Sequence, residues 1–169
     1  MPLATIAQEA GVGVGTLYRR YPSREALLLA LTQRSFQMVL DLAQRAVNSE
    51  GTAIERLRRF IDQTIEHGQE LVLPMHGGPE PLDADTVALR NEVHDTLKEI
   101  LRQGHQDGTI RPDVAAFEII VFGALLARPL PHVANWKSMA RREAVIYFDG
   151  LGAAANPSEP KTRPPDSDH

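Results

Sequence analysis

The sequence contains no cysteine, few aromatic residues and no long apolar run. Among its 169 residues there is no Cys, and the aromatic residues make up 5%. The lack of Cys excludes disulfides, thiolate metal sites and cysteine nucleophiles. No apolar run has the length of a membrane span, and the N-terminus lacks the pattern of a signal peptide. We therefore expect a cytoplasmic protein that makes no contact with a membrane.

Positive charge is also scarce, except near the N-terminus. The formal net charge is −4, which argues against a protein that covers its whole surface with nucleic acid. Residues 1–24, however, contain Arg19, Arg20 and Arg24 against a single acidic residue, Glu9. This asymmetry predicts a local basic patch at one end of an otherwise acidic molecule.

Ala and Leu are abundant and β-branched residues are scattered, which favours an all-α fold. Residues 24–47 contain no Gly or Pro and place Leu28, Leu31, Met38 and Leu42 on one face. We predict one long helix there, with Ser23 as its N-cap.

Four further helices are predicted after residue 48. Thr52 and Glu55 form a capping box that opens a helix to about residue 70, with a break at Gly68. A Pro- and Gly-rich loop follows over 71–82, and Asp83 caps a helix to about residue 103. Asp113 is predicted to cap a helix over 113–128 that is apolar nearly all round and so must be buried on more than one side.

Asn135 is predicted to cap the last helix, residues 136–151, on which the Arg141–Glu143 run is interpreted as a solvated face. Residues 155–169 contain four Pro together with polar residues, which is typical of a disordered tail.

The stretch Ile6–Tyr21 has the pattern of a helix-turn-helix. An apolar helical stripe is followed by Gly11, which tolerates the positive φ of a sharp turn, and by Val12 as an apolar contact within that turn. The second short helix has Leu17 and Tyr21 on its buried side. Two short helices joined in this way place a recognition helix in the major groove of DNA.

These residues resemble the tetracycline-repressor (TetR) family of bacterial regulators. The resemblance rests on Ile6-Ala7, Ala10-Gly11-Val12, Gly15-Thr16-Leu17-Tyr18, Tyr21 and Ser23-Arg24-Glu25-Ala26-Leu27. It is specific over residues 3–31 and only architectural over 32–154, although the run Gly108–Asp113 also looks like the family's approach to its dimerisation helices.

The resemblance implies a homodimer that binds a palindromic operator and releases it when a small-molecule effector occupies the body. Residues 1–24 would be the DNA-binding head, 24–47 the linking helix, and 48–154 the ligand-binding and dimerisation domain. The last two helices, about 113–128 and 136–151, would form the interface with the partner. No cofactor is implied, and the residues that line the effector pocket carry no fixed motif.

The family's DNA contacts can be carried over by position. The start of the recognition helix would meet base edges or phosphates, and a tyrosine hydroxyl would meet a phosphate. Two arginines would reach bases or backbone, and the capped start of the long helix would clamp a phosphate. The eight residues with these roles are Val14, Gly15, Thr16, Tyr18, Arg19, Arg20, Ser23 and Arg24.

One departure from the family concerns its first helix, which normally packs on Ile6, Val12, Leu17 and Tyr21 and has no counterpart here. The expected explanation is a start codon assigned too far downstream, and the alternative is a truncated head. In the second case the protein would be a dimeric helical ligand-binding protein that has lost specific DNA binding.

Other functions are disfavoured by spacing. Gly11–Gly15 lacks the third Gly of a dinucleotide loop and follows a helical stripe rather than a strand. The histidines form no pair with a carboxylate ligand set, so no metal site is expected, although His67, His76 or His94 could line a ligand cavity. No nucleophile stands at a recognisable spacing from a base, so we do not expect an enzyme.

Overall fold

The computed structural model describes residues 3–74, 78 and 80–152, and within them the fold is all-α, as predicted. No β-strand occurs in this part of the chain; Ile110 and Gly152 form one isolated bridge. Within the same residues, no helix combines the length and apolarity needed to cross a membrane. The elements are α1 (Leu3–Glu9), α2 (Val14–Arg20), α3 (Arg24–Val47), α4 (Ala53–Glu66), the 3₁₀ helix η1 (Gly68–Glu70), α5 (Ala84–Gln106), α6 (Ala116–Ala127) and α7 (Trp136–Leu151).

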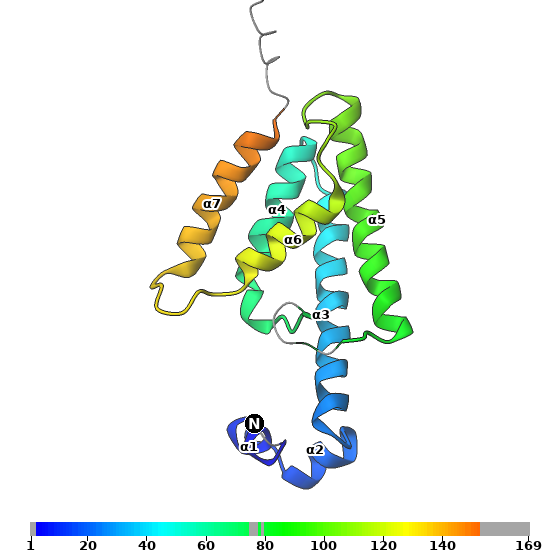
Figure 1. The fold of residues 1–169 in the computed structure, drawn as a ribbon, viewed down its shortest axis with the longest axis vertical. Helices are drawn as coiled ribbons and strands as arrows, with labels where there is room; N and C mark the ends of the chain where they lie inside the picture. The colour runs from blue at the N-terminus through cyan, green and yellow to red at the C-terminus, as the bar shows by residue number, and fades with distance from the viewer. Residues whose placement is uncertain (1–2, 75–77, 79, 153–169) are drawn as a thin grey trace, which may run out of the picture.

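The helices divide between a small head and a larger body (Figure 1). Helices α1 and α2 lie at one end, and α3 runs from this head into the body, where it packs against α5 and α4. Helix α6 crosses the body obliquely, and α7 packs on α4. The predicted tail, residues 155–169, lies outside the described residues.

Three of the predicted helix caps are confirmed. The Ser23 hydroxyl accepts a hydrogen bond from the Ala26 amide at 3.1 Å, and the Asp83 carboxylate accepts one from the Thr86 amide at 2.8 Å. In the capping box, the Thr52 amide donates to Glu55 Oε2 at 2.8 Å, while the Glu55 amide donates to Thr52 Oγ1 at 3.3 Å. Each cap satisfies amides that have no partner inside their helix.

Two predicted caps are wrong. Asp113 pairs with Arg111, whose Nε donates to Asp113 Oδ1 at 3.0 Å, and the residue at the N-cap position of α6 is Ala115. Helix α6 instead begins at Ala116, and Glu118 accepts the Ala115 amide at 2.7 Å. Asn135 does precede α7, but it adopts a left-handed conformation (φ 59°) and its side chain caps no amide.

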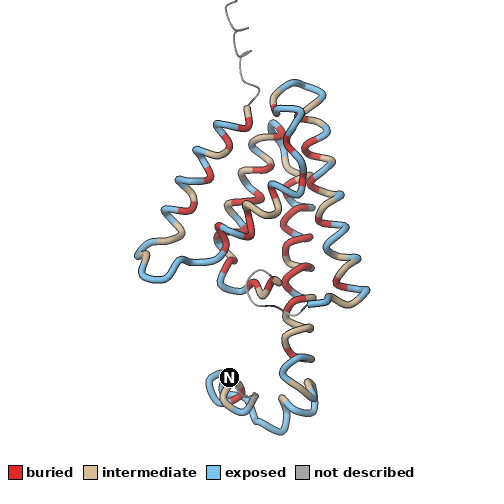
Figure 2. The backbone as a smooth tube through the Cα atoms, in the orientation of Figure 1, coloured by how far each residue is buried: buried red, intermediate tan, exposed pale blue. Residues whose placement is uncertain are grey.

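The core lies where α3, α4, α5 and α6 meet (Figure 2). The predicted apolar face of α3 is only partly right: Leu42 is buried, whereas Leu28, Leu31 and Met38 are partly exposed. The buried positions are instead shared between the sides that face α4 and α5, because α3 is enclosed by both helices. They are Leu27, Thr32, Ser35, Phe36, Val39, Leu40, Leu42, Ala43 and Ala46.

The break predicted at Gly68 is confirmed, because α4 ends at Glu66 and η1 begins at Gly68. This glycine lies against the last residue of α6. A Cβ atom at position 68 would stand 2.0 Å from the carbonyl oxygen of Ala127, far inside van der Waals contact. The end of α4 and the end of α6 therefore touch backbone to backbone.

Candidate nucleic-acid interface and ligand-binding body

The turn between α1 and α2 is closed by backbone hydrogen bonds. Gly11 has a φ of +66°, as predicted, and the Val12 amide donates to the Ala7 carbonyl at 3.0 Å. The prediction of Val12 as an apolar contact within the turn is wrong, because 45% of this residue is exposed. The positive φ of Gly11 and these backbone hydrogen bonds form the turn without a buried side chain at Val12.

Helix α2 lies between the turn and α3, and it contains no buried residue. Leu17 and Tyr21 are partly buried, which is consistent with their predicted inner position. The outer residues form what we call the recognition face: Val14, Gly15, Thr16, Tyr18, Arg19 and Arg20, all of them exposed. Tyr18 is 46% exposed, so its hydroxyl and ring edge are open to a partner.

The start of α3 adjoins this face. The Ser23 hydroxyl binds the Ala26 amide, and the Ser23 carbonyl accepts the Leu27 amide at 3.2 Å. Hydrogen bonds from the backbone amide of Glu25 and from Ser23 hold the pKa of the Glu25 carboxyl below its usual range, as expected for an anion at a helix N-terminus. The exposed Arg24 stands at the same end.

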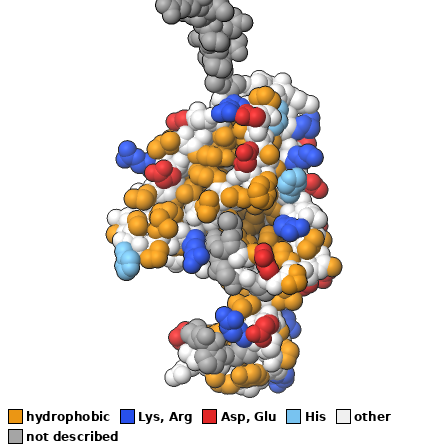
Figure 3. Space-filling model, viewed as in Figure 1, with side chains coloured by type: hydrophobic (Ala, Val, Ile, Leu, Met, Phe, Trp, Pro, Cys, Tyr) orange, Lys and Arg blue, Asp and Glu red, His pale blue; other side chains and the backbone are white. Residues whose placement is uncertain are grey.

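The basic residues of the head are open to solvent. Arg19, Arg20 and Arg24 make no ion pair within the described part of the chain, and all three are exposed. Figure 3 shows Lys and Arg side chains projecting from the head. The recognition face and the capped start of α3 together carry exposed apolar, hydroxyl and cationic groups, the kinds of group that bind phosphates and base edges.

The body encloses a small apolar cavity of about 40 Å³ between α3, α4, α5 and α6. Its walls include Phe36, Val39, Phe60, Leu73 and Ile120, and Arg90 lies at its edge. Sequence reasoning missed these residues, because they come from five separate segments. Of the histidines considered for a cavity, His94 lines a separate outer groove of about 540 Å³ along α5. His76 lies outside the described residues.

Helices α6 and α7 expose large apolar side chains. Phe117 is 66% exposed, Leu125 is 58% exposed and Ile146 is 59% exposed, and Met139 and Val145 are also open. Figure 3 shows hydrophobic side chains gathered over this side of the body. Phe122 of α6 stacks on Tyr147 of α7 with ring centroids 3.8 Å apart, which joins the two helices beneath this apolar face.

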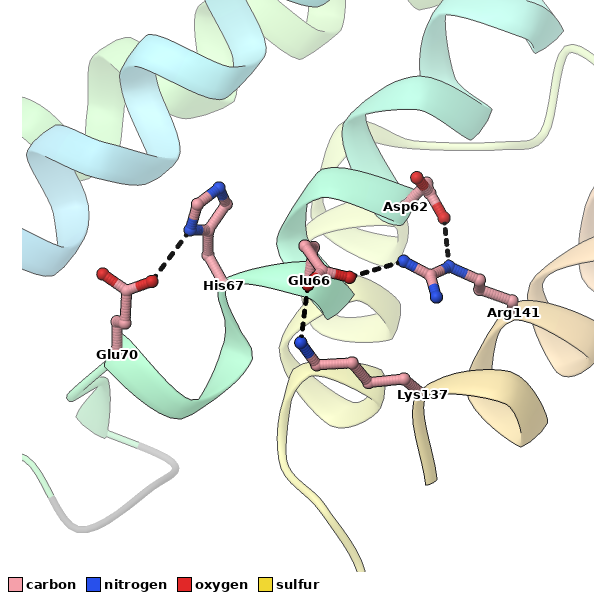
Figure 4. Close-up of polar contacts among 6 residues, drawn as sticks. All are labelled: Asp62, Glu66, His67, Glu70, Lys137 and Arg141. Atoms are coloured by element: carbon pink, nitrogen blue, oxygen red, sulfur yellow. Dashed lines mark hydrogen bonds and ion pairs between the residues drawn. The ribbon is translucent and has the colours of Figure 1, made fainter. Parts of the chain in front are cut away.

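Ion pairs fix α7 against α4 (Figure 4). Arg141 Nε donates to Asp62 at 2.6 Å, and its second nitrogen donates to Glu66 at 2.7 Å. Lys137 Nζ donates to the other oxygen of Glu66 at 2.7 Å, and this bond together with Arg141 lowers the pKa of the Glu66 carboxyl. Arg142 and Glu143, predicted to lie on a solvated face, are exposed, and the Arg141 side chain remains 42% exposed while it pairs with α4.

Comparisons with known proteins agree with this geometry. A family model described as "Bacterial regulatory proteins, tetR family" matches residues 1–31. The fatty acid metabolism regulator protein of Bacillus subtilis is 24% identical over 137 residues, which are 73% of this chain and 68% of that protein. The transcriptional repressor KstR of Mycolicibacterium smegmatis is 38% identical over 59 residues, which are 35% of this chain and only 29% of that protein.

A solved structure shares the fold along most of the chain. The TetR family transcriptional regulator PfmR from Thermus thermophilus superposes with a TM-score of 0.68 at 19% identity, over 89% of each chain. The match of the head to the family model and the match of head and body to this fold agree with the helix-turn-helix seen in α1 and α2. Residues 1–31 thus match the N-terminal domain of the tetR family of bacterial regulatory proteins, and the described head and body share the fold of a solved TetR family regulator.

Proposed function

We propose that this regulator acts in the cytoplasm as a homodimer that binds a palindromic operator and is released by a small-molecule effector. Helix α2 would enter the major groove. Residues Val14, Gly15 and Thr16 would meet base edges or nearby phosphates, and Arg19 and Arg20 would reach bases or backbone. The Tyr18 hydroxyl, Ser23 and Arg24 would hold phosphates.

The observation that carries this proposal is the exposed recognition face. A short helix with no buried residue leaves a tyrosine, a valine and two arginines open to solvent, at the basic end of an acidic protein. Exposing such apolar groups has no benefit for folding. Their position beside three exposed arginines supports a role in binding a polyanion.

The apolar face of α6 and α7 supports the dimer. In α6, Phe117, Val121 and Leu125 follow one another at a spacing of four residues, so they lie along one side of the helix. Exposed apolar patches of this kind mark interaction sites, and a two-fold interface buries the same patch on both copies. Two heads held in this way would read two half-sites one helical turn apart.

A hydroxyl links the cavity wall to the helix that carries the head. Ser35 Oγ accepts the Val72 amide at 2.8 Å and donates to the Leu31 carbonyl at 2.7 Å. Val72 is the neighbour of Leu73, which lines the cavity. An effector that displaces Leu73 would therefore pull on α3 at Ser35, about three turns from its start at Arg24, and would change the spacing of the two heads.

The test begins with selection of binding sites from a random duplex library, followed by titration of the selected site at several salt concentrations. Specific binding should weaken steeply as salt rises. The variants Arg19→Ala and Arg20→Ala should each cost roughly 1–3 kcal/mol where the arginine contacts a base, or reduce the salt slope by about one where it contacts a phosphate. Arg45→Ala, an exposed arginine in the last turn of α3, is the matched control.

The rival function predicts a different result. A dimeric ligand-binding protein without specific DNA recognition would select no sequence from the library, and its weak DNA binding would respond equally to Arg19→Ala and Arg45→Ala. That outcome would refute the operator-binding proposal and leave the body's role as a ligand-binding module.

A further inference from the structure

Arg90 occupies an inward position of α5. Thr86 precedes it by four residues and Val93 follows it by three, and both are buried, as is Leu97 one turn further on. Residues at this spacing lie on one side of a helix. Arg90 therefore interrupts the buried stripe of α5 with a charge, and it remains exposed.

This charge has no counterion within the described residues. Its nearest side-chain partner is the neutral amide oxygen of Asn91, at 3.5 Å, the limit for a hydrogen bond. The contrast with Arg102 on the same helix is clear, because Arg102 donates two hydrogen bonds to Glu99, at 2.9 and 2.7 Å. Because Arg90 is exposed to solvent, it needs no counterion of its own, and its guanidinium is free to bind an anion.

The apolar cavity lies beside Arg90, and its other walls offer almost nothing polar. Phe36, Val39, Phe60 and Leu73 are hydrocarbon or aromatic. The Thr64 hydroxyl donates its proton to the Phe60 carbonyl at 2.8 Å, so it can only accept a further hydrogen bond. A ligand in this cavity would therefore meet one cationic donor, Arg90, and no other side-chain donor among the described walls.

We propose that the effector is an amphipathic carboxylate, with its hydrocarbon part in the cavity and its carboxylate on the Arg90 guanidinium. This inference rests on the proposed effector-responsive function and specifies its ligand class. The planar guanidinium can hold a carboxylate through two parallel hydrogen bonds. Neutral alcohols and cationic amphiphiles lack that interaction and bind more weakly.

The size of the cavity adds a condition. A volume of about 40 Å³ is close to the share of a single water molecule. A hydrocarbon chain is larger than this volume, so the cavity must widen to admit it. Among the described lining residues, Leu73 is the one that does not lie in a helix. Entry of the ligand thus moves the segment whose neighbouring amide, that of Val72, is bound to Ser35.

The test is calorimetric titration of the full chain, without DNA, with dodecanoate and with dodecanol, each below the concentration at which it aggregates. Four proteins are compared: the wild type, Arg90→Ala, Arg90→Lys and Lys98→Ala. Lys98 is an exposed cation on the same helix that lines the outer groove instead of the cavity, so it serves as the matched control. A fifth variant, Ala124→Leu, fills the cavity, and circular dichroism checks that it folds.

Dodecanoate should bind the wild type and Lys98→Ala equally, and Arg90→Ala should weaken it at least tenfold. Arg90→Lys should fall between them, because it keeps the charge and loses the planar fork. Dodecanol should bind weakly, and its affinity should be the same in the wild type and in the Arg90 variants. Ala124→Leu should reduce the affinity for both ligands. Equal affinity for the two ligands, no effect of Arg90→Ala, a loss in Lys98→Ala, or no binding of dodecanoate would each overturn the proposal.

The operator titration separates this inference from the function on which it rests. Dodecanoate binding that depends on Arg90 but does not release the selected DNA would uphold the ligand class and refute the effector mechanism. Specific DNA binding by a protein that binds no carboxylate would uphold the regulator and refute the ligand class.

Discussion

The indole Nε1 of Trp136 donates a hydrogen bond to the backbone carbonyl oxygen of Leu126 at 2.8 Å. The donor is the first residue of α7 and the acceptor lies in the last turn of α6, where helix carbonyls have no partner of their own. This bond closes the 128–135 connection and holds the start of α7 beside the end of α6. It thereby sets how the two halves of the proposed dimer surface lie together.

Replacement of Trp136 by Phe tests this role. The ring can still pack, but the hydrogen bond is lost and the Leu126 carbonyl is left without its partner. We expect a loss of about 1–3 kcal/mol in the free energy of unfolding, measured by urea denaturation followed by circular dichroism. A denaturation midpoint equal to that of the wild type would show that the hydrogen bond does not stabilise the junction.

The capping box at α4 gives a second prediction. Thr52→Ala removes the hydroxyl that accepts the Glu55 amide, and should destabilise the protein by about 1 kcal/mol. Thr96→Ala is the matched control, because the Thr96 hydroxyl donates to the Glu92 carbonyl within α5 and caps nothing. That control should be neutral or slightly stabilising, since Ala is the better helix former. Equal losses in the two variants would contradict the capping interpretation.

Ser23→Ala should affect DNA binding, which we assign to the head, without affecting dimerisation, which we assign to the body. It removes the cap of α3 at the end that we assign to phosphate binding, so operator affinity should fall several-fold while dimerisation is unchanged. Fluorescence anisotropy with the selected DNA measures the first quantity, and sedimentation measures the second. If affinity is unaffected, the start of α3 is not a phosphate clamp.

The apolar face of α6 predicts the state of association. A protein with both Phe117→Glu and Leu125→Glu should sediment as a monomer at concentrations where the wild type is dimeric, because burial of two carboxylates in an apolar interface is strongly unfavourable. Gln44→Glu places one such carboxylate on an exposed site of α3 and should stay dimeric. A double variant that remains dimeric would place the interface elsewhere.

The Arg102–Glu99 pair predicts a dependence on pH. Hydrogen bonds from Arg102 and then Gln103 lower the pKa of the Glu99 carboxyl from 4.5 to about 2. A carboxyl with a lowered pKa in the folded state stabilises the protein above its unfolded pKa of 4.5, and this contribution disappears as the pH falls toward 2. The pair is exposed, so we expect a small effect that salt reduces further.

Glu99→Gln should therefore make the free energy of unfolding less dependent on pH between about 4.5 and 2, as measured by thermal denaturation across that interval. The control is Glu92→Gln, an exposed carboxylate of the same helix without an ion pair in the described part of the chain. An identical pH profile in the two variants would mean that the pair contributes nothing in solution.

Local signals predicted much of this fold. The bounds of α3, the caps at Ser23, Thr52 and Asp83, and the break at Gly68 depend on neighbouring residues, so a linear sequence contains them. Asp113 was assigned wrongly because an equally local partner, Arg111, binds its carboxylate and α6 begins only at Ala116. Asn135 precedes α7 as predicted, but its backbone is left-handed and its side chain makes no cap hydrogen bond.

Contacts between residues far apart in the sequence could not be predicted. The pairing of Arg141 was not predicted, because its partners, Asp62 and Glu66, lie more than seventy residues away in the sequence. The cavity walls and the role of Arg90 need the packing of several helices. For the head, the recognition residues follow from the resemblance of residues 3–31 and from their exposure, and their contacts with DNA remain predictions.

The backbone contact at Gly68 has a consequence for how this body can move. Side chains normally act as compliant spacers between packed helices, because they can change rotamer when one helix shifts. No such spacer exists where Gly68, just beyond the end of α4, meets Ala127. The ends of α4 and α6 therefore form a stiff joint, and a cavity that widens must do so by tilting helices about that joint rather than by sliding them past it.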